Sequence, residues 1–410
     1  MGSFDDPEAL RLGAIFVLHG PQAGINWQRA RSASVAVQEI NTAGGVPTGR
    51  GFRKLALLTC DTGDDVVLAG EHLIDDLGVA AIIGPNASQD VIALNNRLTI
   101  ARGTPTISPT AMADSIADLA DHDLSWLLAP TDVQRGPLLI DEIHALEAAL
   151  RERDPERPLK LSVVYRDDVL GAGTRLALTE LTWHDKPLSD PENLGAHVRL
   201  DAYPTDVEDY DSLLDAQLAF GPDVVVLVGT GEAVSGILAP WEARLHNQPV
   251  PTPTPKPHYL LTDASKTPEL LAHARRLPDL IQRVHGIGVA PGRETLAIYQ
   301  AFERAYQAEY PDDALDVGGL GASYDAVYAL AYAAAAQRDG EPLSAGFAAL
   351  SQGQRAVAVG PDTFIAAATE LRAGGQLRAL GTLAPLSWDV RGAPIAGSLE
   401  VWCLAPGEGD

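Results

Sequence analysis

The sequence predicts an α/β protein built from two doubly wound parallel-sheet lobes. Apolar runs of strand length, each closed by Gly, Pro or Asp, alternate with stretches whose apolar residues recur every 3.6 positions. That alternation is typical of strands connected by helices. The same succession of four strand-like runs occurs twice along the chain. The predicted strands begin near Leu12, Arg53, Gly78 and Thr104 in the first set and near Leu159, His197, Pro222 and His258 in the second.

Helices with recognisable ends fit between the predicted strands. Ala33, Val37 and Ile40 share one helical face just before two glycines, which are a common helix stop. Thr267 precedes a proline that suits the first helical position, so we expect Thr267 to cap a helix. After about residue 290 we expect helices near 293–309, 321–337, 343–353 and 361–371, followed by a strand pair near 386–403.

Composition and net charge argue against some classes of binding partner. The 410 residues are 46% hydrophobic, which is ample for the buried cores of two to three domains. A net charge of −25 arises from 30 Lys and Arg against 55 Asp and Glu, and it repels phosphate backbones and anionic lipid surfaces. We therefore expect no nucleic-acid or membrane-surface partner. The longest apolar run, Ala326 to Ala336, is shorter than the roughly 20 residues that a spanning helix needs.

The two cysteines, Cys60 and Cys403, are too few for a metal cage or a disulfide framework. Both follow apolar, strand-like residues, so two buried free thiols are the expectation and one long-range disulfide is the alternative. The number of cysteines does not indicate whether the protein resides in an oxidising or a reducing compartment.

Motifs of common enzyme classes and of metal sites are missing. The sequence contains no G-x-S-x-G, HExxH or P-loop. Gly229-Thr230-Gly231 follows a predicted strand, but Val234 occupies the third glycine position of a dinucleotide loop and no acidic residue stands about 20 residues on. A tight turn is the expectation there, and no cofactor is expected. Asp121-His122-Asp123 predicts no metal site, because adjacent side chains do not converge on one ion.

The turns between strands and helices contain the candidate ligand-binding residues. In doubly wound sheets, ligands bind beyond the carboxyl ends of the strands, where helix N-termini offer unpaired N–H groups. The turns at 84–88 and 108–112 suit a carboxylate, and Ser88 either caps its own helix or faces an anion. An acid at a lobe-two turn such as Asp263, across a cleft from that anion site, would complement a zwitterion. The acid pairs Asp64-Asp65 and Asp167-Asp168 are expected to cap helices.

Segments along the whole chain resemble one family in the same order. The first are LGAIFVLHGPQAGINWQRARSASVAVQEINTAGGV, GRGFRKLALLTCDTGD, VAAIIGPNAS, TPTISPTA and APTDVQRG, and the later ones are VVYRDDVLGAG, PDVVVLVGTGEA, YLLTDASKTPELL, YDAVYALAYA and APLSWDVRGAP. On these residues the chain is similar to the type I periplasmic binding proteins of branched-chain amino-acid ABC transporters. The resemblance covers residues 11 to about 402, and the shared order of the segments makes it specific.

The resemblance implies a non-catalytic solute-binding protein that captures an amino acid or a related small carboxylate for an ABC importer. It implies lobe one at 10–130 plus 291–380 and lobe two at 131–290 plus 381–410, joined by three crossovers and closing by hinge motion on a ligand in the cleft between them. An ABC permease is then the partner. We expect a monomer in the periplasm or outside the cell, with or without a lipid anchor, delivered by a signal that the start MGSFDDPEAL does not contain.

The resemblance also assigns pocket residues. Ser88 falls at the carboxylate-binding serine, Thr110 where a backbone group assists it, and Asp263 at the acidic position that holds the ligand ammonium. Met112 replaces a threonine that usually binds the carboxylate, so one donor is lost. Non-aromatic residues stand where Leu/Ile/Val binders commonly have aromatic ones: Ile25, Leu170, Thr230 and Gly319. Three aromatic residues are either pocket walls or core residues: Trp27, Trp126 and Tyr324.

Two other classes of function stay open. A sensor or regulatory receptor domain of the same fold would read its ligand for a signalling receptor partner instead of a permease, and a neighbouring permease or kinase gene would separate the two. An enzyme on a Rossmann-like scaffold would need a paired nucleophile and base. The sequence shows no such pair.

The non-aromatic residues at the expected pocket positions predict that leucine, isoleucine and valine are poor ligands. Ile25, Leu170, Thr230 and Gly319 leave more room than aromatic rings would, and a buried CH₂ contributes about 0.8 kcal/mol only where protein packs against it. Larger aromatic or long polar amino acids, or aromatic carboxylates, should bind more tightly. A competition panel measures this, and a preference for leucine, isoleucine or valine over every larger ligand would contradict it.

Overall fold

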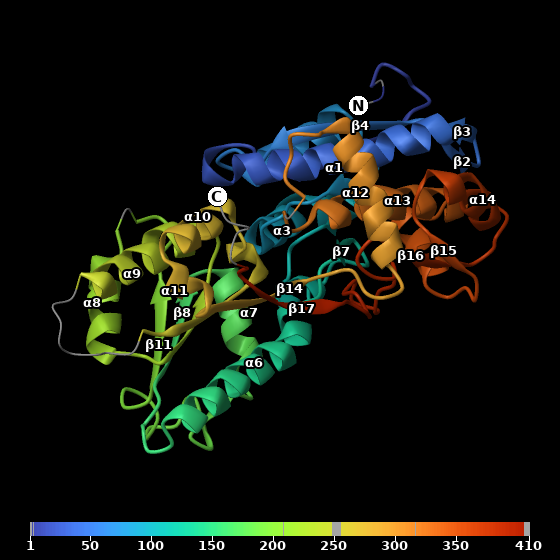
Figure 1. The fold of residues 1–410 in the computed structure, drawn as a ribbon. Coiled ribbons are helices and arrows are strands. Elements are labelled where there is room, and N and C mark those ends of the chain that lie inside the picture. The colour runs from blue at the N-terminus through green and yellow to red at the C-terminus, as the bar shows by residue number, and fades with distance from the viewer. Residues whose placement is uncertain (1, 3, 208, 248–255, 316, 406–410) are drawn as a thin grey trace. The chain divides into compact units, whose positions relative to one another are not determined.

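The computed structural model of the chain describes residues 2, 4–207, 209–247, 256–315 and 317–405 (Figure 1). It consists of two compact units, each formed by separate stretches of sequence. Unit 1 comprises Met1–Thr131 and Val289–Ser398, and unit 2 comprises Asp132–Gly288 and Leu399–Asp410.

Unit 1 contains a parallel sheet with the strand order β4-β1-β5-β6-β7. Its strands are buried apolar runs, as expected for a parallel sheet covered on both faces. They are β1 (Leu10–Phe16), β4 (Leu55–Asp61), β5 (Ile82–Ile83), β6 (Thr106–Ser108) and β7 (Ser125–Leu127). Two small pairs lie outside it: β2 (Val46–Thr48) with β3 (Gly51–Arg53), and β15 (Ala356–Ala358) with β16 (Arg378–Leu380).

The helices of unit 1 follow the strands or come from the second stretch of sequence. The first group is α1 (Ala23–Ala43), α2 (Val66–Glu71), α3 (Ser88–Leu94), α4 (Ile100–Arg102) and α5 (Asp114–Ala117). The second group is α12 (Leu296–Glu309), α13 (Leu320–Ala336), a 3₁₀ segment at Leu343–Leu350 and α14 (Pro361–Arg372).

Helix α13 is the centre of the unit 1 core. Every residue of α13 is buried, and α13 packs against α1, α14 and the 3₁₀ segment Leu343–Leu350 (Figure 1). A helix that is apolar on nearly all sides is stable in a globular protein only where its side chains are buried. The apolar run that is too short to span a membrane is therefore a core helix. None of the helices in the described residues combines the length and the apolar composition needed to cross a membrane.

Unit 2 contains a sheet with the strand order β11-β8-β12-β13-β14-β17. The pairs from β11 to β14 are parallel. The strands are β8 (Leu161–Arg166), β11 (Val198–Tyr203), β12 (Val224–Val228), β13 (His258–Leu261), β14 (Val284–Val289) and β17 (Leu399–Cys403). A separate antiparallel hairpin pairs β9 (Thr182–Trp183) with β10 (Lys186–Pro187).

The helices of unit 2 connect the strands of its sheet (Figure 1). They are α6 (Asp132–Arg153), α7 (Val169–Ala177), α8 (Asp211–Phe220), α9 (Ala239–His246), α10 (Pro268–Arg276) and α11 (Pro278–Ile281). The predicted caps are present. Asp65 accepts a hydrogen bond from the Val67 N–H at the start of α2, and Asp168 accepts one from the Gly171 N–H in α7. Thr267 caps α10 as expected.

The predicted α/β fold with parallel sheets is confirmed, and each of the eight predicted strand runs overlaps an observed strand. The strands β2, β7 and β14, the β9–β10 hairpin and the β15–β16 pair were not predicted, and the expected strand pair near 386–403 is the single strand β17. Both cysteines are free, but neither is fully buried as expected: Cys60 is half-buried and Cys403 is exposed on β17.

Residues 381–398 lie in unit 1, whereas the sequence analysis assigned them to lobe two. Three contacts hold this segment there. The Trp388 indole Nε1 donates to the Leu127 carbonyl at 2.6 Å, and Leu386 is buried in the core around α13. The Asp325 carboxylate of α13 accepts the Thr382 N–H at 2.8 and 2.9 Å and the Thr382 hydroxyl at 2.8 Å.

This Asp325 contact predicts a specific pH dependence of stability. Burial raises the pKa of Asp325 to about 7, although the Thr382 donors act against the rise. A carboxyl group whose folded pKa lies above its unfolded pKa of about 3.9 binds its proton more tightly in the folded state. Its contribution to stability is complete below pH 3.9 and is lost as pH rises through about 7.

Asp325→Asn removes that titration while keeping an acceptor for the Thr382 N–H. We expect the stability of the variant relative to the unaltered protein to increase by roughly 1–3 kcal/mol between pH 4.5 and pH 8, since one pKa unit corresponds to about 1.4 kcal/mol. Urea unfolding across that pH range measures it, with exposed Asp312→Asn as the control. A pH-independent difference would contradict the raised pKa.

Candidate ligand-binding edges of the two sheets

In unit 1, the turns that follow β5 and β6 meet at Ser88. The Ser88 side chain is buried, and its Oγ accepts the Met112 N–H at 3.3 Å and the Ala113 N–H at 3.2 Å. Ser88 therefore does not cap its own helix, whose N-cap residue is Ala87. Within the described residues no acceptor takes the Ser88 hydroxyl proton. The group is thus a donor held in place by two backbone amides.

A polar network adjoins Ser88 and fixes the same turns. The Asn86 Nδ2 donates to Asn26 Oδ1 at 2.8 Å, and the Arg29 guanidinium donates to the same oxygen at 2.9 Å. The Thr110 hydroxyl donates to the Asn86 carbonyl at 3.1 Å. In the described part of the chain, the buried Asn86 Oδ1 has no donor. This edge of unit 1 therefore offers one hydroxyl donor and one amide acceptor.

The backbone conformation and the neighbouring Thr110 require a glycine at position 319. Gly319 has a φ of +86°, and a Cβ there would lie 2.4 Å from Thr110 Cγ2 and 3.0 Å from Arg29 Nε. Any side chain would be strained in this backbone conformation and would push Thr110 away. On α1, Ile25 is half-buried against the core, whereas Trp27 is 47% exposed.

Of the candidate wall aromatics, one lies in the core of unit 1 and one packs against it. Tyr324 is 3% exposed, packs against Phe302 and donates its hydroxyl to Glu39. Burial raises the pKa of Glu39, although the tyrosine hydroxyls act against the rise. Trp126 packs on Phe347 with ring centroids 4.5 Å apart. Core packing accounts for the buried Tyr324, whereas Trp126 is half-buried against the core and Trp27 is exposed, so a wall role for these two tryptophans stays a prediction.

In unit 2, Arg166 organises the carboxyl ends of β8 and β12. Its guanidinium pairs with Asp168 at 2.7 Å and with Glu232 at 3.3 Å, and it donates to the Thr230 hydroxyl at 3.3 Å. Thr230 donates its own N–H to Glu232 at 3.0 Å. Burial raises the pKa of Glu232, but Arg166 and the Thr230 donors outweigh it and the net pKa is lowered. Thr230 is therefore part of an ionic network.

Asp263, which follows β13, pairs with an arginine from α6. Arg135 Nη2 donates to Asp263 Oδ1 at 2.6 Å, and the Arg135 guanidinium also lies 3.8 Å from the Asp132 carboxylate. The side chains of Arg135 and Asp132 are 3% and 2% exposed, and that of Asp263 is 24% exposed. Leu170 on α7 is half-buried against the apolar cluster around β8. The predicted roles of Asp263 and Leu170 in holding a ligand stay predictions.

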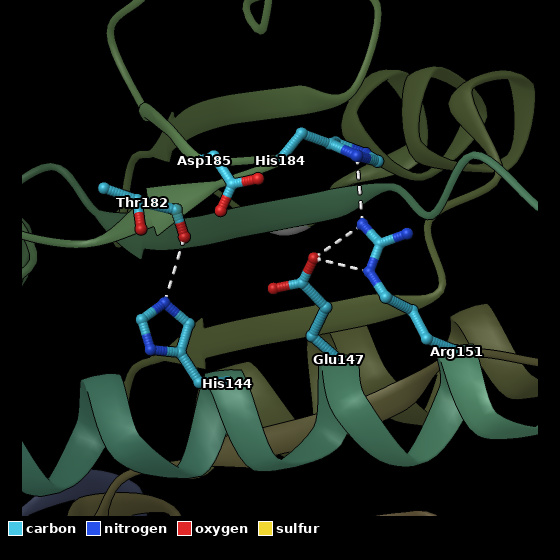
Figure 2. A pocket seen from close by; sticks show the side chains of 6 residues that line it. All are labelled: His144, Glu147, Arg151, Thr182, His184 and Asp185. Carbon is cyan, nitrogen blue, oxygen red and sulfur yellow. Dashed lines mark hydrogen bonds and ion pairs between the residues drawn. The ribbon is translucent and has the colours of Figure 1, made fainter. Parts of the chain in front are cut away.

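A separate polar pocket lies at the other end of the unit 2 sheet. Figure 2 shows His144, Glu147 and Arg151 of α6 facing Thr182, His184 and Asp185 of the β9–β10 hairpin around a cavity of about 620 Å³. Arg151 pairs with Glu147 at 2.7 Å and donates to His184 Nδ1 at 3.0 Å. His184 Nε2 donates to the carbonyl of Leu159, which precedes β8. This pocket is therefore at the amino edge, away from the carboxyl ends beyond which doubly wound sheets generally bind their ligands.

No metal centre emerges from the described residues, because none of their His, Cys, Asp and Glu side chains form a group of three or more that could hold an ion. Sequence reasoning missed four polar residues at the carboxyl edges: Asn26, Arg29, Arg135 and Arg166. Asn26 and Arg29 follow a predicted strand, Arg135 stands in APTDVQRG and Arg166 in VVYRDDVLGAG. Their position in those segments was the sequence feature that could have indicated a place near the site.

Comparison with known proteins identifies the fold to which these two units belong. No protein-family model matches the chain. The Leu/Ile/Val-binding protein homolog 7 of Brucella abortus is 27% identical over 219 residues, which are 53% of this chain and 51% of that protein. The chain thus spans about half the length of the curated relatives that it matches.

Solved structures match nearly the whole chain. A type 1 periplasmic binding protein from Bordetella pertussis has a TM-score of 0.70 at 16% identity and covers 98% of both chains. The chain has the type I periplasmic binding protein fold. A fatty acid ABC transporter substrate-binding protein from Thermomonospora curvata, with a TM-score of 0.56 at 21% identity, covers 80% of this chain and 76% of its own. The resemblance indicated by the sequence is confirmed, and Ser88 and Asp263 lie at the carboxyl edges of this periplasmic-binding-protein fold.

Ser88→Ala tests the unit 1 edge. A hydrogen bond to a charged group contributes roughly 1.5–3 kcal/mol, so loss of the Ser88 donor should weaken binding of a carboxylate ligand about tenfold or more. Ser34→Ala is the matched control, because among the described residues the Ser34 hydroxyl donates to the Ala30 carbonyl within α1 and not to a residue of the turns. Titration calorimetry on both variants measures the effect, and an unchanged affinity in Ser88→Ala would show that the ligand does not contact Ser88.

Proposed function

We propose that the chain is a non-catalytic solute-binding protein that captures an amino acid or a related small carboxylate for an ABC importer. The observation that carries the proposal is the Ser88 arrangement at the carboxyl edge of the unit 1 sheet. Two backbone amides donate to the Ser88 oxygen, which leaves its hydroxyl proton available for donation. Such a preorganised donor suits a ligand carboxylate.

The same arrangement weighs against an enzyme. A nucleophilic serine needs a base within hydrogen-bond reach that takes its proton. The partners of Ser88 in the described residues are the amides of Met112 and Ala113, which donate. They hold the oxygen in position and do not activate it.

The names of similar proteins support capture for transport. The Brucella relative is named for leucine, isoleucine and valine, and the Thermomonospora structure for fatty acids and an ABC transporter. Both names describe solutes that carry a carboxylate. We propose the same role here, with an ABC permease as partner, the periplasm or cell exterior as location, a lipid anchor as the means of retention there, and a monomer as the working form. That one ligand contacts both Ser88 and Asp263 remains a prediction.

A ligand screen by thermal shift tests the proposal. A solute at a hundred times its dissociation constant should stabilise the folded protein by about 2.7 kcal/mol, so a library of amino acids and carboxylic acids should contain clear hits. Mass spectrometry of the recovered ligand separates binding from catalysis. A ligand returned chemically unchanged after long incubation supports the proposal, whereas a changed mass or a library without any hit would contradict it.

A further inference from the structure

The cavity at the amino edge of the unit 2 sheet has a wall of fixed backbone geometry. The β9–β10 hairpin turns through His184 and Asp185, whose φ angles are +52° and +60°. A two-residue hairpin turn of this kind needs a positive φ at both positions, and histidine and aspartate adopt such angles more readily than most residues. The turn places both side chains opposite helix α6 (Figure 2).

The contacts of His184 determine which of its ring nitrogens carries the proton. Arg151 Nη2 lies 3.0 Å from His184 Nδ1, and because a guanidinium can only donate, Nδ1 accepts. His184 Nε2 lies 2.9 Å from the Leu159 carbonyl, which can only accept, so Nε2 donates. The ring is therefore neutral, and both of its nitrogens are already used.

Two carboxylates keep oxygens available to the cavity. Arg151 Nε and Nη2 both donate to Glu147 Oε1, at 3.0 and 2.7 Å, and no donor in the described part of the chain contacts Glu147 Oε2. The Asp185 carboxylate has no hydrogen bond or ion pair with any described residue. Figure 2 shows Asp185 and the unbonded oxygen of Glu147 pointing into the space between the hairpin and α6.

The side chains around the cavity carry a net negative charge. Glu147 and Asp185 bring two negative charges and Arg151 brings one positive charge, while His184 is neutral. Lys186 of the hairpin is paired with Glu192, so that pair adds no net charge. With His144 in its neutral form, the cavity therefore attracts a monovalent cation and repels an anion.

The size of the cavity and the arrangement of its ligands indicate the kind of cation. Among the described residues, no three His, Cys, Asp or Glu side chains are grouped so that they could hold a metal ion. A volume of about 620 Å³ is also far larger than a single ion needs. It admits an organic cation whose N–H groups donate to Asp185 and Glu147. Such charge-assisted hydrogen bonds are stronger than those between neutral groups.

We propose that this cavity is a second binding site, for a monovalent organic cation whose ammonium or guanidinium group donates to Asp185 and to the free oxygen of Glu147. A small solute or a lysine or arginine side chain of another protein carries the cation. Arg151 is a positioning residue, since it holds Glu147 by its other oxygen. The site lies within unit 2, away from the carboxyl edges, and does not depend on the proposed function. Because Asp185 is exposed, water competes for the site and binding should be weak, in the millimolar range.

Matched cationic and neutral probes test the site on the unaltered protein. Methylguanidinium is compared with N-methylurea, which has nearly the same shape without the charge, and ethanolammonium is compared with 1,2-ethanediol. NMR titrations followed at the backbone amides of His184 and Asp185 measure binding at this cavity. We expect at least one cation to bind about fivefold more tightly than its neutral partner. If neither cation shifts these amides, or if each neutral partner binds equally well, the proposal is overturned.

A further pair of probes distinguishes the two sources of the cation. N-acetylarginine methylamide presents the same guanidinium on a protein-like side chain, and N-acetylcitrulline methylamide is its neutral counterpart. Tighter binding of the arginine derivative than of methylguanidinium supports the site as one for a side chain of another protein. The reverse order supports it as a site for a free solute.

Variants test the two carboxylates. Asp185→Asn removes one negative charge and keeps the turn, because asparagine also adopts a positive φ readily, and Glu147→Gln removes the other charge. We expect the affinity for the bound cation to fall about fivefold in each variant. Glu152→Gln is the control, since Glu152 is exposed on the same helix and does not line the cavity, and it should leave the affinity unchanged. Unaltered affinity in both Asp185→Asn and Glu147→Gln would overturn the proposal.

Discussion

The direction of the strands is the constraint on which the candidate site depends. Parallel strands bring all of their carboxyl ends to one edge of a sheet, and the turns that follow them must share that edge. In unit 1 this places Ser88 beside the turn after β6, so that Met112 and Ala113 can donate to it. In unit 2 it gathers Arg166, Thr230 and Asp263 from strands that are far apart in sequence.

The charge pairs at the unit 2 edge are weak sources of stability. Removing an arginine and an acid from water costs about as much as their attraction returns, so buried pairs are weak stabilisers. Arg135 is nevertheless buried with Asp132 and bonded to Asp263. At this edge of unit 2 two guanidinium groups, those of Arg135 and Arg166, are each shared by two carboxylates.

The parts of the structure that follow from local pattern could be predicted from the sequence. Strands such as β12 are continuous apolar runs ended by turn residues, and the caps Asp65, Asp168 and Thr267 act over two or three residues. Strand β14 could not be found this way, because its two glycines lower strand propensity. Gly286 is required there by Trp402, since a Cβ would lie 2.0 Å from the indole. The Arg135–Asp263 bond likewise joins residues 128 positions apart, and no local sequence pattern indicates it.

Each unit is discontinuous in sequence, and this has a consequence for how the chain is made. Unit 1 needs residues up to Ser398 for its core, because α13 and the segment 381–398 pack against elements from the first 131 residues. Unit 2 takes its edge strand β17 from Leu399–Cys403. Neither hydrophobic core is complete while the ribosome still holds the C-terminal residues. Both cores therefore become complete only after almost the whole chain has been synthesised, since Trp388 belongs to the core of unit 1 and Trp402 and Leu404 to that of unit 2.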